Sequence, residues 1–130
     1  MADYREHYPE IRAAGADIVA VSVDAPDKSE ALRGHLSLAF PILCDTERNV
    51  VREWGVYNSV EKGGIANPAV FIIDSSRIVR YAAVDTVVRR VPAAEIIFLL
   101  QNAEGQPVRR RVYVPLFSEW IRAIRNIVQG

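Results

Sequence analysis

The chain has 130 residues, half of them apolar and a quarter charged, and its formal net charge at pH 7 is zero. This length suits one globular domain with its own core, and the balanced charge excludes an overall field favouring nucleic acid or anionic lipid. Cys44 is the only cysteine, which excludes an intrachain disulfide and a thiolate metal cluster and favours a reducing compartment, the cytoplasm. The apolar stretches have strand length, so we expect neither a signal peptide nor a membrane span.

The first half of the chain predicts alternating helices and strands. We expect a helix over residues 2–14, which Gly15 ends, although Pro9 weakens the pattern. Residues 18–23 form a continuous run of β-branched residues and alanine, typical of a strand buried on both faces. The following elements are a helix that begins near Asp27 and covers 29–36, a strand over 40–43, and a helix that Thr46 caps and Gly55 ends.

The second half begins with two apolar runs, 69–73 and 78–84, whose separation by Asp74-Ser75-Ser76-Arg77 predicts an antiparallel hairpin. Pro92 then opens a helix that continues to Gln101. Residues 108–114 predict a strand, and an amphipathic helix starts at Ser118 with apolar positions at Trp120, Ile121, Ile124, Ile127 and Val128. This helix serves either as a dimer face or as a cover for the core. We predict a domain over residues 1–101 and an extension over 102–130.

Several landmarks lie in AGADIVAVSVDAPDKSEALRGHLSLAFPILCDTERNVVREWGV (14–56) and PAVFIIDSSRIVRYAAV (68–84). They are Gly15, Ser22-Val23-Asp24, Phe40-Pro41, Asp45, Gly55-Val56 and Phe71-Ile72-Ile73-Asp74. Their order and spacing resemble the alkyl hydroperoxide reductase/thiol-specific antioxidant family, the peroxiredoxins. The resemblance implies an α/β, thioredoxin-like fold of the peroxiredoxin subgroup that lacks its N-terminal strand and carries a C-terminal strand and helix extension.

The family activity that the resemblance implies is reduction of hydrogen or alkyl peroxides by a cysteine thiolate, which a dithiol donor then restores, without metal or organic cofactor. In that family the catalytic cysteine lies at the start of the helix corresponding to residues 2–14, where helix amides lower its pKa. No cysteine is present there. We therefore expect an N-terminally truncated or degenerate peroxiredoxin with little peroxidase activity; the alternative is a non-catalytic protein that binds a partner or oligomerises.

Two further expectations come from the resemblance. Pro68 stands six positions before Asp74, where typical peroxiredoxins have arginine, and it resembles the cis-proline that helps thioredoxin-like oxidoreductases position substrate. The family also has a central strand between the strands predicted at 18–23 and 69–73, and that strand is absent here. We expect residues 108–114 to complete the sheet, in the same chain or in a partner's.

Cys44 is the one residue that offers redox chemistry, because it follows a strand and precedes a helix start that would stabilise a thiolate. The favoured interpretation is a buried structural cysteine without a catalytic role. A third interpretation is a thiol switch that forms mixed disulfides without turnover.

The other polar candidates have structural explanations. His7 and His35 lack the partners of a metal site or triad. Asp24, Asp45 and Asp74 are expected to cap helices or form turns. Arginines at 89–90 and 109–111 lack a phosphate loop or interleaved aromatic residues, so we expect no nucleic-acid partner.

Overall fold

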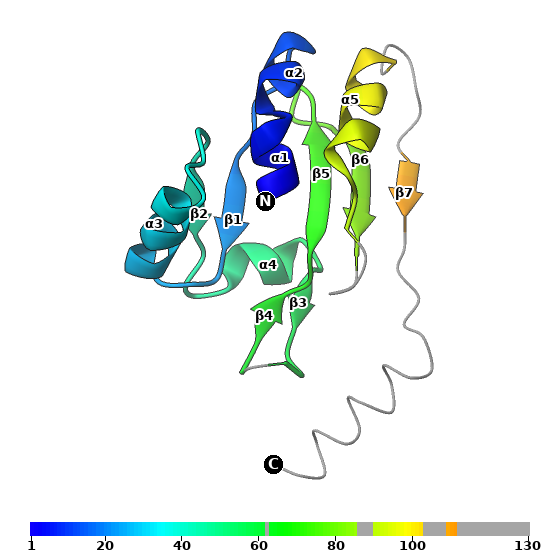
Figure 1. Ribbon diagram of the computed structural model, residues 1–130. Coiled ribbons are helices and arrows are strands. Elements are labelled where there is room, and N and C mark those ends of the chain that lie inside the picture. The colour runs from blue at the N-terminus through cyan, green and yellow to red at the C-terminus, as the bar shows by residue number, and fades with distance from the viewer. Residues whose placement is uncertain (62, 86–89, 103–108, 112–130) are drawn as a thin grey trace. The chain divides into compact units, whose positions relative to one another are not determined.

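The computed structural model describes residues 1–61, 63–85, 90–102 and the backbone of 109–111. The chain divides into two compact units. The first contains α1 (Ala2–Glu6), α2 (Tyr8–Ala13), β1 (Ala20–Ser22), α3 (Pro26–His35), β2 (Ile42–Cys44) and α5 (Ala93–Gln101). The second contains most of α4 (Asn49–Glu53), with β3 (Tyr57–Asn58), β4 (Ile65–Ala66), β5 (Ala69–Ile73), β6 (Val79–Val84) and β7 (Arg109–Arg111). Figure 1 labels these elements.

The single helix expected over residues 2–14 is in fact two short helices, α1 and α2, separated at His7. The cause is Pro9, which lies in the first turn of α2 and cannot sit inside a longer helix, because its ring displaces the carbonyl four residues earlier and it lacks an N–H. Gly15 follows α2 with a positive φ of 84°, so the predicted helix stop is confirmed.

A parallel pair of strands forms the sheet of the first unit. β1 and β2 are in register from Ala20 opposite Ile42 to Ser22 opposite Cys44, and α3 connects them. The prediction that residues 18–23 are buried on both faces is wrong, since Val19 is 58% exposed and Val21 is 44% exposed. β1 pairs with no strand other than β2 in the described part of the chain, so one of its edges lacks a neighbour that would cover it.

The core of the first unit lies where α2, α5 and the segment before β2 meet. Ile11 and Phe40 are its largest fully buried side chains, and the ring of Tyr8 packs at 5.5 Å from that of Phe40. The start of α5 is tied to α1, because Asp3 Oδ2 accepts the Ala93 N–H at 2.7 Å. The Tyr4 hydroxyl also donates to the Val91 carbonyl at 3.0 Å, which fixes α5 beside the first helices, as Figure 1 shows.

The second unit is built around the predicted hairpin, which is confirmed. β5 and β6 pair antiparallel from Ala69 opposite Val84 onward, with an irregularity between Ile72 and Ile73. The turn closes through the Arg77 N–H, which donates to the Asp74 carbonyl at 2.9 Å. Tyr81 and Ala83 of β6 are buried, and the ring of Trp54, the residue after α4, meets the Phe71 ring edge-on at 4.8 Å.

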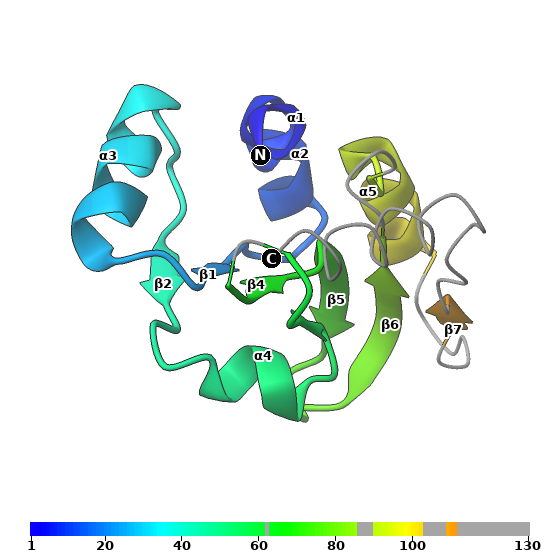
Figure 2. The same cartoon turned by 90° about the horizontal axis from the view of Figure 1, so that it is seen from below.

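The expectation for the tail strand is corrected by its position. Within residues 108–114 the structure describes β7, which runs parallel to β6 in the sheet order β5-β6-β7. Figure 2 shows β7 beside β6, on the side opposite β5. Among the described residues β7 therefore pairs with β6 and not with β5, so it does not complete the open side of β5 in its own chain, and pairing with a partner's sheet stays a prediction. Residues 112–130, including the helix predicted from Ser118, lie outside the described part, so the boundary at 101 stays a prediction.

Candidate functional site

The only thiol of the chain lies at the end of β2. Cys44 is the last residue of that strand and stands opposite Ser22 of β1 in the parallel register. Its side chain is exposed, so the expectation of a buried cysteine is wrong. The reason is that Cys44 belongs to a small two-stranded sheet on which Val21 and Leu43 are exposed as well. The site predicted at Cys44 is therefore an accessible thiol.

The residue after Cys44 organises the turn that leads to α4. Asp45 is buried, its N–H donates to the Ser22 carbonyl at 2.7 Å, and its Oδ1 accepts the Asn49 N–H at 2.9 Å. Asp45 therefore caps α4 in place of the predicted Thr46. In the described residues no hydrogen bond or ion pair reaches the Cys44 sulfur. The described geometry therefore leaves the thiol accessible to solvent.

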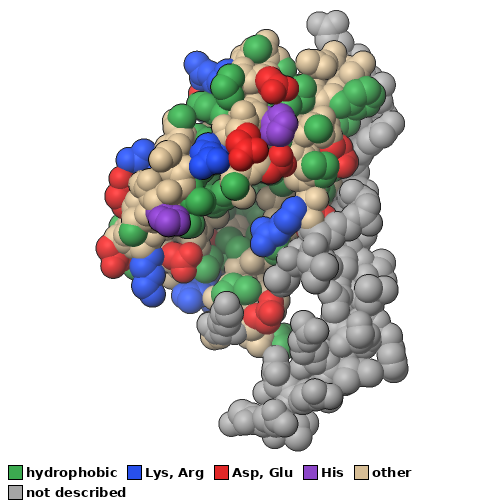
Figure 3. Space-filling view, in the orientation of Figure 1, with side chains coloured by type: hydrophobic (Ala, Val, Ile, Leu, Met, Phe, Trp, Pro, Cys, Tyr) green, Lys and Arg blue, Asp and Glu red, His purple; other side chains and the backbone are tan. Residues whose placement is uncertain are grey.

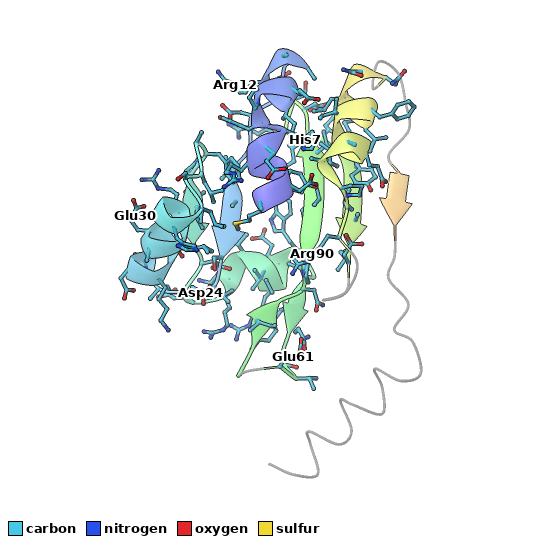
Figure 4. The ribbon with its side chains drawn as sticks, viewed as in Figure 1. His7, Arg12, Asp24, Glu30, Glu61 and Arg90 are labelled. Carbon is cyan, nitrogen blue, oxygen red and sulfur yellow. The ribbon has the colours of Figure 1, made fainter. Side chains whose placement is uncertain are left out.

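Asp24 and Asp74 have the structural roles predicted for them. The Ser22 hydroxyl donates to Asp24 Oδ2 at 2.7 Å, and the Asp24 N–H donates back to that hydroxyl at 3.1 Å, which closes the turn after β1 (Figure 4). Asp74 accepts the Ile78 N–H at 2.9 Å and Arg80 Nε at 2.6 Å. The Ile78 N–H, and then the Arg80 guanidinium, hold the pKa of Asp74 below its ordinary value.

The histidines form no metal site in the part of the chain that the structure describes. His7 Nδ1 lies 2.9 Å from the Asp3 carbonyl and 3.2 Å from Asp3 Oδ1. The hydrogen bond to the Asp3 carbonyl is the main cause that raises the pKa of His7, and the neighbouring carboxylates add to it. His7 lies between α1 and α2 and is half-buried, and not at the helical surface position predicted for it; Figure 4 labels its position.

Pro68 differs in conformation from the cis-proline that it resembles. The described residues contain no cis peptide bond, so the bond before Pro68 is trans. Its carbonyl accepts the Asp85 N–H at 2.7 Å and begins the ladder between β5 and β6, which explains the extended backbone at this position. Pro68 belongs to the second unit and Cys44 to the first, and substrate binding at either residue stays a prediction.

Basic side chains do not gather on the face of the molecule drawn in Figure 3, where Lys and Arg alternate with Asp and Glu. Arg90 is exposed, whereas Arg89 and the side chains of 109–111 are outside the described set. No described helix is both long and apolar enough to span a membrane.

Comparison with solved structures defines the class of protein. The reduced Prx3 of Vibrio vulnificus, in complex with H2O2, superposes with a TM-score of 0.71 at 18% identity, over 81% of this chain and 68% of that one. AhpC of Enterococcus faecalis gives a TM-score of 0.71 at 21% identity, over 84% and 70% of the two chains. The fold is therefore the thioredoxin-like fold of peroxiredoxins, as the sequence predicted.

Sequence comparison gives the family. Residues 1–82 match the AhpC/TSA family, and the chain belongs to it. Alkyl hydroperoxide reductase E of Mycobacterium tuberculosis is 34% identical over 80 residues, which are 60% of this chain and 51% of that protein. Peroxiredoxin 2 of Thermoplasma acidophilum is 30% identical over 84 residues, 60% of this chain and 41% of that protein. The aligned region thus spans about half or less of these relatives.

Proposed function

We propose that the chain has the fold of an AhpC/TSA-family thiol peroxidase, whose reaction is the reduction of hydrogen peroxide or alkyl hydroperoxides. We also propose that Cys44 is not the peroxidatic residue. The match of residues 1–82 to the family carries the first part. The exposed position of Cys44, with no described hydrogen bond or ion pair to its sulfur, supports the second part. By itself, the chain is expected to consume little or no peroxide.

The proposed reaction needs a thiolate that attacks one peroxide oxygen. The O–O bond breaks as the S–O bond forms, the alcohol or water leaves with a proton, and the cysteine becomes a sulfenic acid. A dithiol donor then supplies two electrons, which restores the thiol, releases water and leaves the donor as a disulfide. No step requires a metal or an organic cofactor.

Activation of the thiolate is the step for which Cys44 has no described hydrogen-bond or ion-pair partner. A reactive cysteine lies beside a cation or at a helix start whose amides stabilise the thiolate. At Cys44 the nearest helix start is already capped, because Asp45 accepts the Asn49 N–H. Cys44 is therefore expected to behave as an ordinary surface thiol.

The first test measures peroxide consumption in the presence of dithiothreitol. The chain and its Cys44→Ser variant are expected to show the same rate, close to that of dithiothreitol alone. An active peroxiredoxin assayed in parallel is the positive control. Turnover by the chain that Cys44→Ser abolishes would instead make Cys44 the peroxidatic residue.

The second test concerns the protein as its native cells make it. Its intact mass and N-terminal peptide are determined first, and its peroxide turnover is then assayed with dithiothreitol and with a thioredoxin system. Turnover supports the peroxidase assignment. If the native protein consumes neither hydrogen peroxide nor an alkyl hydroperoxide, the assignment fails and the non-catalytic alternative replaces it.

The proposal extends to partners and location. Peroxides and a dithiol are the small-molecule partners, and a homo-oligomer is the expected assembly, without nucleic acid or membrane. The single cysteine of the chain supports the reducing cytoplasm as its compartment.

The accessible thiol of Cys44 also allows the interpretation as a thiol switch. In that case, exposure of the chain to oxidised glutathione adds one glutathione to Cys44, and an unchanged mass of the chain would exclude this interpretation.

A further inference from the structure

The start of α5 is held by a carboxylate of α1. Pro92, the residue before α5, makes no side-chain hydrogen bond to the helix. Asp3 takes this role, because its Oδ2 accepts the Ala93 N–H at 2.7 Å, and Ala93 is fully buried. The first N–H groups of a helix lack partners within it, and this end carries partial positive charge. The Asp3 carboxylate is therefore favourable at this position and binds the start of α5 to α1.

The second oxygen of the same carboxylate faces a histidine. His7 Nδ1 lies 3.2 Å from Asp3 Oδ1 and 2.9 Å from the Asp3 carbonyl oxygen. His7 also lies at the break between α1 and α2, and neither helix has a side-chain cap there. Figure 4 labels His7 at this break. The imidazole, the Asp3 carboxylate and the Ala93 amide thus form a continuous chain from the helix break to α5.

The charged groups on the helices around His7 favour its protonated form. The carboxylates are Asp3 and Glu6 on α1, Glu10 on α2 and Glu95 in the first turn of α5. The basic residues of α1 and α2 are Arg5 and Arg12, which form ion pairs with Glu6 and Asp17, respectively. The hydrogen bond to the Asp3 carbonyl raises the pKa of His7 most. Partial burial lowers it, and the carboxylates of Asp3, Glu10 and Glu6 raise it further.

We propose that His7 and Asp3 form a pH-sensitive latch between the helix break and the start of α5. The protonated ring holds the Asp3 carboxylate toward the Ala93 amide, and loss of the proton loosens this hold. A neutral ring with its proton on Nδ1 keeps the hydrogen bond to the Asp3 carbonyl but no longer attracts the carboxylate by charge. The step is therefore a loosening of α5 and not its release.

The direction of the pH effect follows from the raised pKa of His7. The stabilisation is complete below the ordinary histidine pKa of about 6.5 and is lost as the pH rises through the raised value. α5 places Ile96 and Ile97 in the core of its unit. The latch thus makes the attachment of a core helix respond to pH in the range where histidine titrates.

The first experiment follows backbone amide signals by NMR across the titration of His7 and needs no variant. The Ala93 amide signal should shift with the same midpoint as the His7 ring, because the charge of the ring acts on the carboxylate that the amide binds. The Ile78 amide is the internal control. It donates to Asp74 Oδ1 at 2.9 Å, but the charged partner of that carboxylate is Arg80, so its signal should not shift in this range. An Ala93 signal that stays fixed while the His7 ring titrates would overturn the proposal.

Three variants separate the charge of the ring from its packing. His7→Gln keeps a hydrogen-bond donor but cannot titrate, so the shift of the Ala93 signal should disappear. His35→Gln removes the other histidine of the chain, which lies on α3, and should leave that shift unchanged. Asp3→Asn keeps an oxygen for the Ala93 N–H but removes the charge, so the titration midpoint of His7 should fall. An unchanged midpoint in Asp3→Asn would show that the carboxylate and the ring are not coupled, and the latch would be wrong.

The last experiment measures the strength of the latch by amide hydrogen exchange. After correction for the base catalysis of exchange itself, the protection of the Ala93 amide should fall by about two- to fivefold as His7 loses its proton, the range of an exposed ion pair. In His7→Gln the protection should not depend on pH. A fall of the same size in His7→Gln, or no fall in the unmodified chain, would contradict the proposal.

Discussion

β5 and β6 are the two strands of one hairpin. β5 is the more hydrophobic of the two, yet it is the less buried. β5 is entirely apolar and has no buried residue, whereas β6 contains Arg80 and still buries Tyr81 to 5% and Ala83 to 0% exposure. The difference lies in their neighbours. β6 is paired on both edges, by β5 and by β7, while β5 is paired with β6 alone in the described part of the chain.

The comparison teaches that strand burial depends on position in the sheet as well as on composition. Strand propensity is largely a measure of how well side chains pack on a pleated, partly covered surface. β1 repeats the situation of β5 within its own unit, since among the described residues it pairs with β2 alone, and Val21, like Val19 just before the strand, is exposed. Apolar strands with one partner are thus a property of both units.

The largest expected effect comes from placing a carboxylate in each strand of the hairpin. Ala83→Asp should lower the free energy of unfolding by about 3 kcal/mol or more, because a charge would be buried without a partner. Ala69→Asp should cost about 1 kcal/mol or less, because water reaches the edge of β5. Urea denaturation followed by circular dichroism measures both values. Similar costs would show that β5 is covered in solution and would remove the contrast.

A smaller effect tests whether the Trp54 ring covers β5 by packing against Phe71. In a double-mutant cycle, Trp54→Ala and Phe71→Ala should show a coupling energy of about 0.5–1.5 kcal/mol, the range for edge-on aromatic pairs. The control cycle combines Trp54→Ala with Ile78→Ala, a substitution at an exposed position, in place of Phe71→Ala. These two substitutions should be additive. Coupling that is equal in the two cycles would mean that α4 does not hold Phe71 specifically.

The smallest effect concerns the turn that joins the two strands. Because the folded-state pKa of Asp74 is lowered, its carboxylate stabilises the fold above the ordinary pKa of about 4, and this contribution is lost as the pH falls through the lowered value. The stability difference between the chain and Asp74→Asn should therefore be greatest near neutral pH and vanish in acid. Unfolding midpoints measured across this pH range provide the check.

A substitution of Arg80, the second hydrogen-bond partner of Asp74, separates the two causes of the lowered pKa. Arg80→Gln removes the guanidinium but leaves the Ile78 N–H, which has the larger influence on the pKa of Asp74. It should retain most of the pH dependence. If Arg80→Gln abolishes the dependence as completely as Asp74→Asn does, the ion pair and not the turn would control Asp74.

Local signals in the sequence predicted local structure well. The hairpin over β5 and β6 followed from two apolar runs with a polar turn, and the stops at Gly15 and Gly55 agree with their positive φ angles of 84° and 67°. Pro9 weakens the helical pattern in the sequence, and in the structure it lies in the first turn of α2, where it separates α2 from α1. The thioredoxin-like fold followed from the order and spacing of short motifs, since each motif marks a fixed point of the chain.

Features that depend on distant parts of the chain could not be predicted in the same way. The exposure of Cys44 and of the strand before α3 depends on which neighbours are present, and a continuous apolar run looks the same with one partner or two. The position of β7 beside β6 depends on a connection through residues that carry no pairing signal. Asp3 was not considered a capping residue, because the helix that it caps begins 90 residues later.

The bond between Asp3 and Ala93 also has a consequence for the order of folding during synthesis. α1 and α2 leave the ribosome before α5, because Ala93 and Val91, to which Asp3 and Tyr4 bind, are made 90 and 87 residues later, respectively. Contacts that join such distant residues close a large loop and form late. Ile11, which packs in the same core, must therefore keep an exposed apolar face until α5 is translated, and nascent chains should be clients of chaperones until α5 emerges.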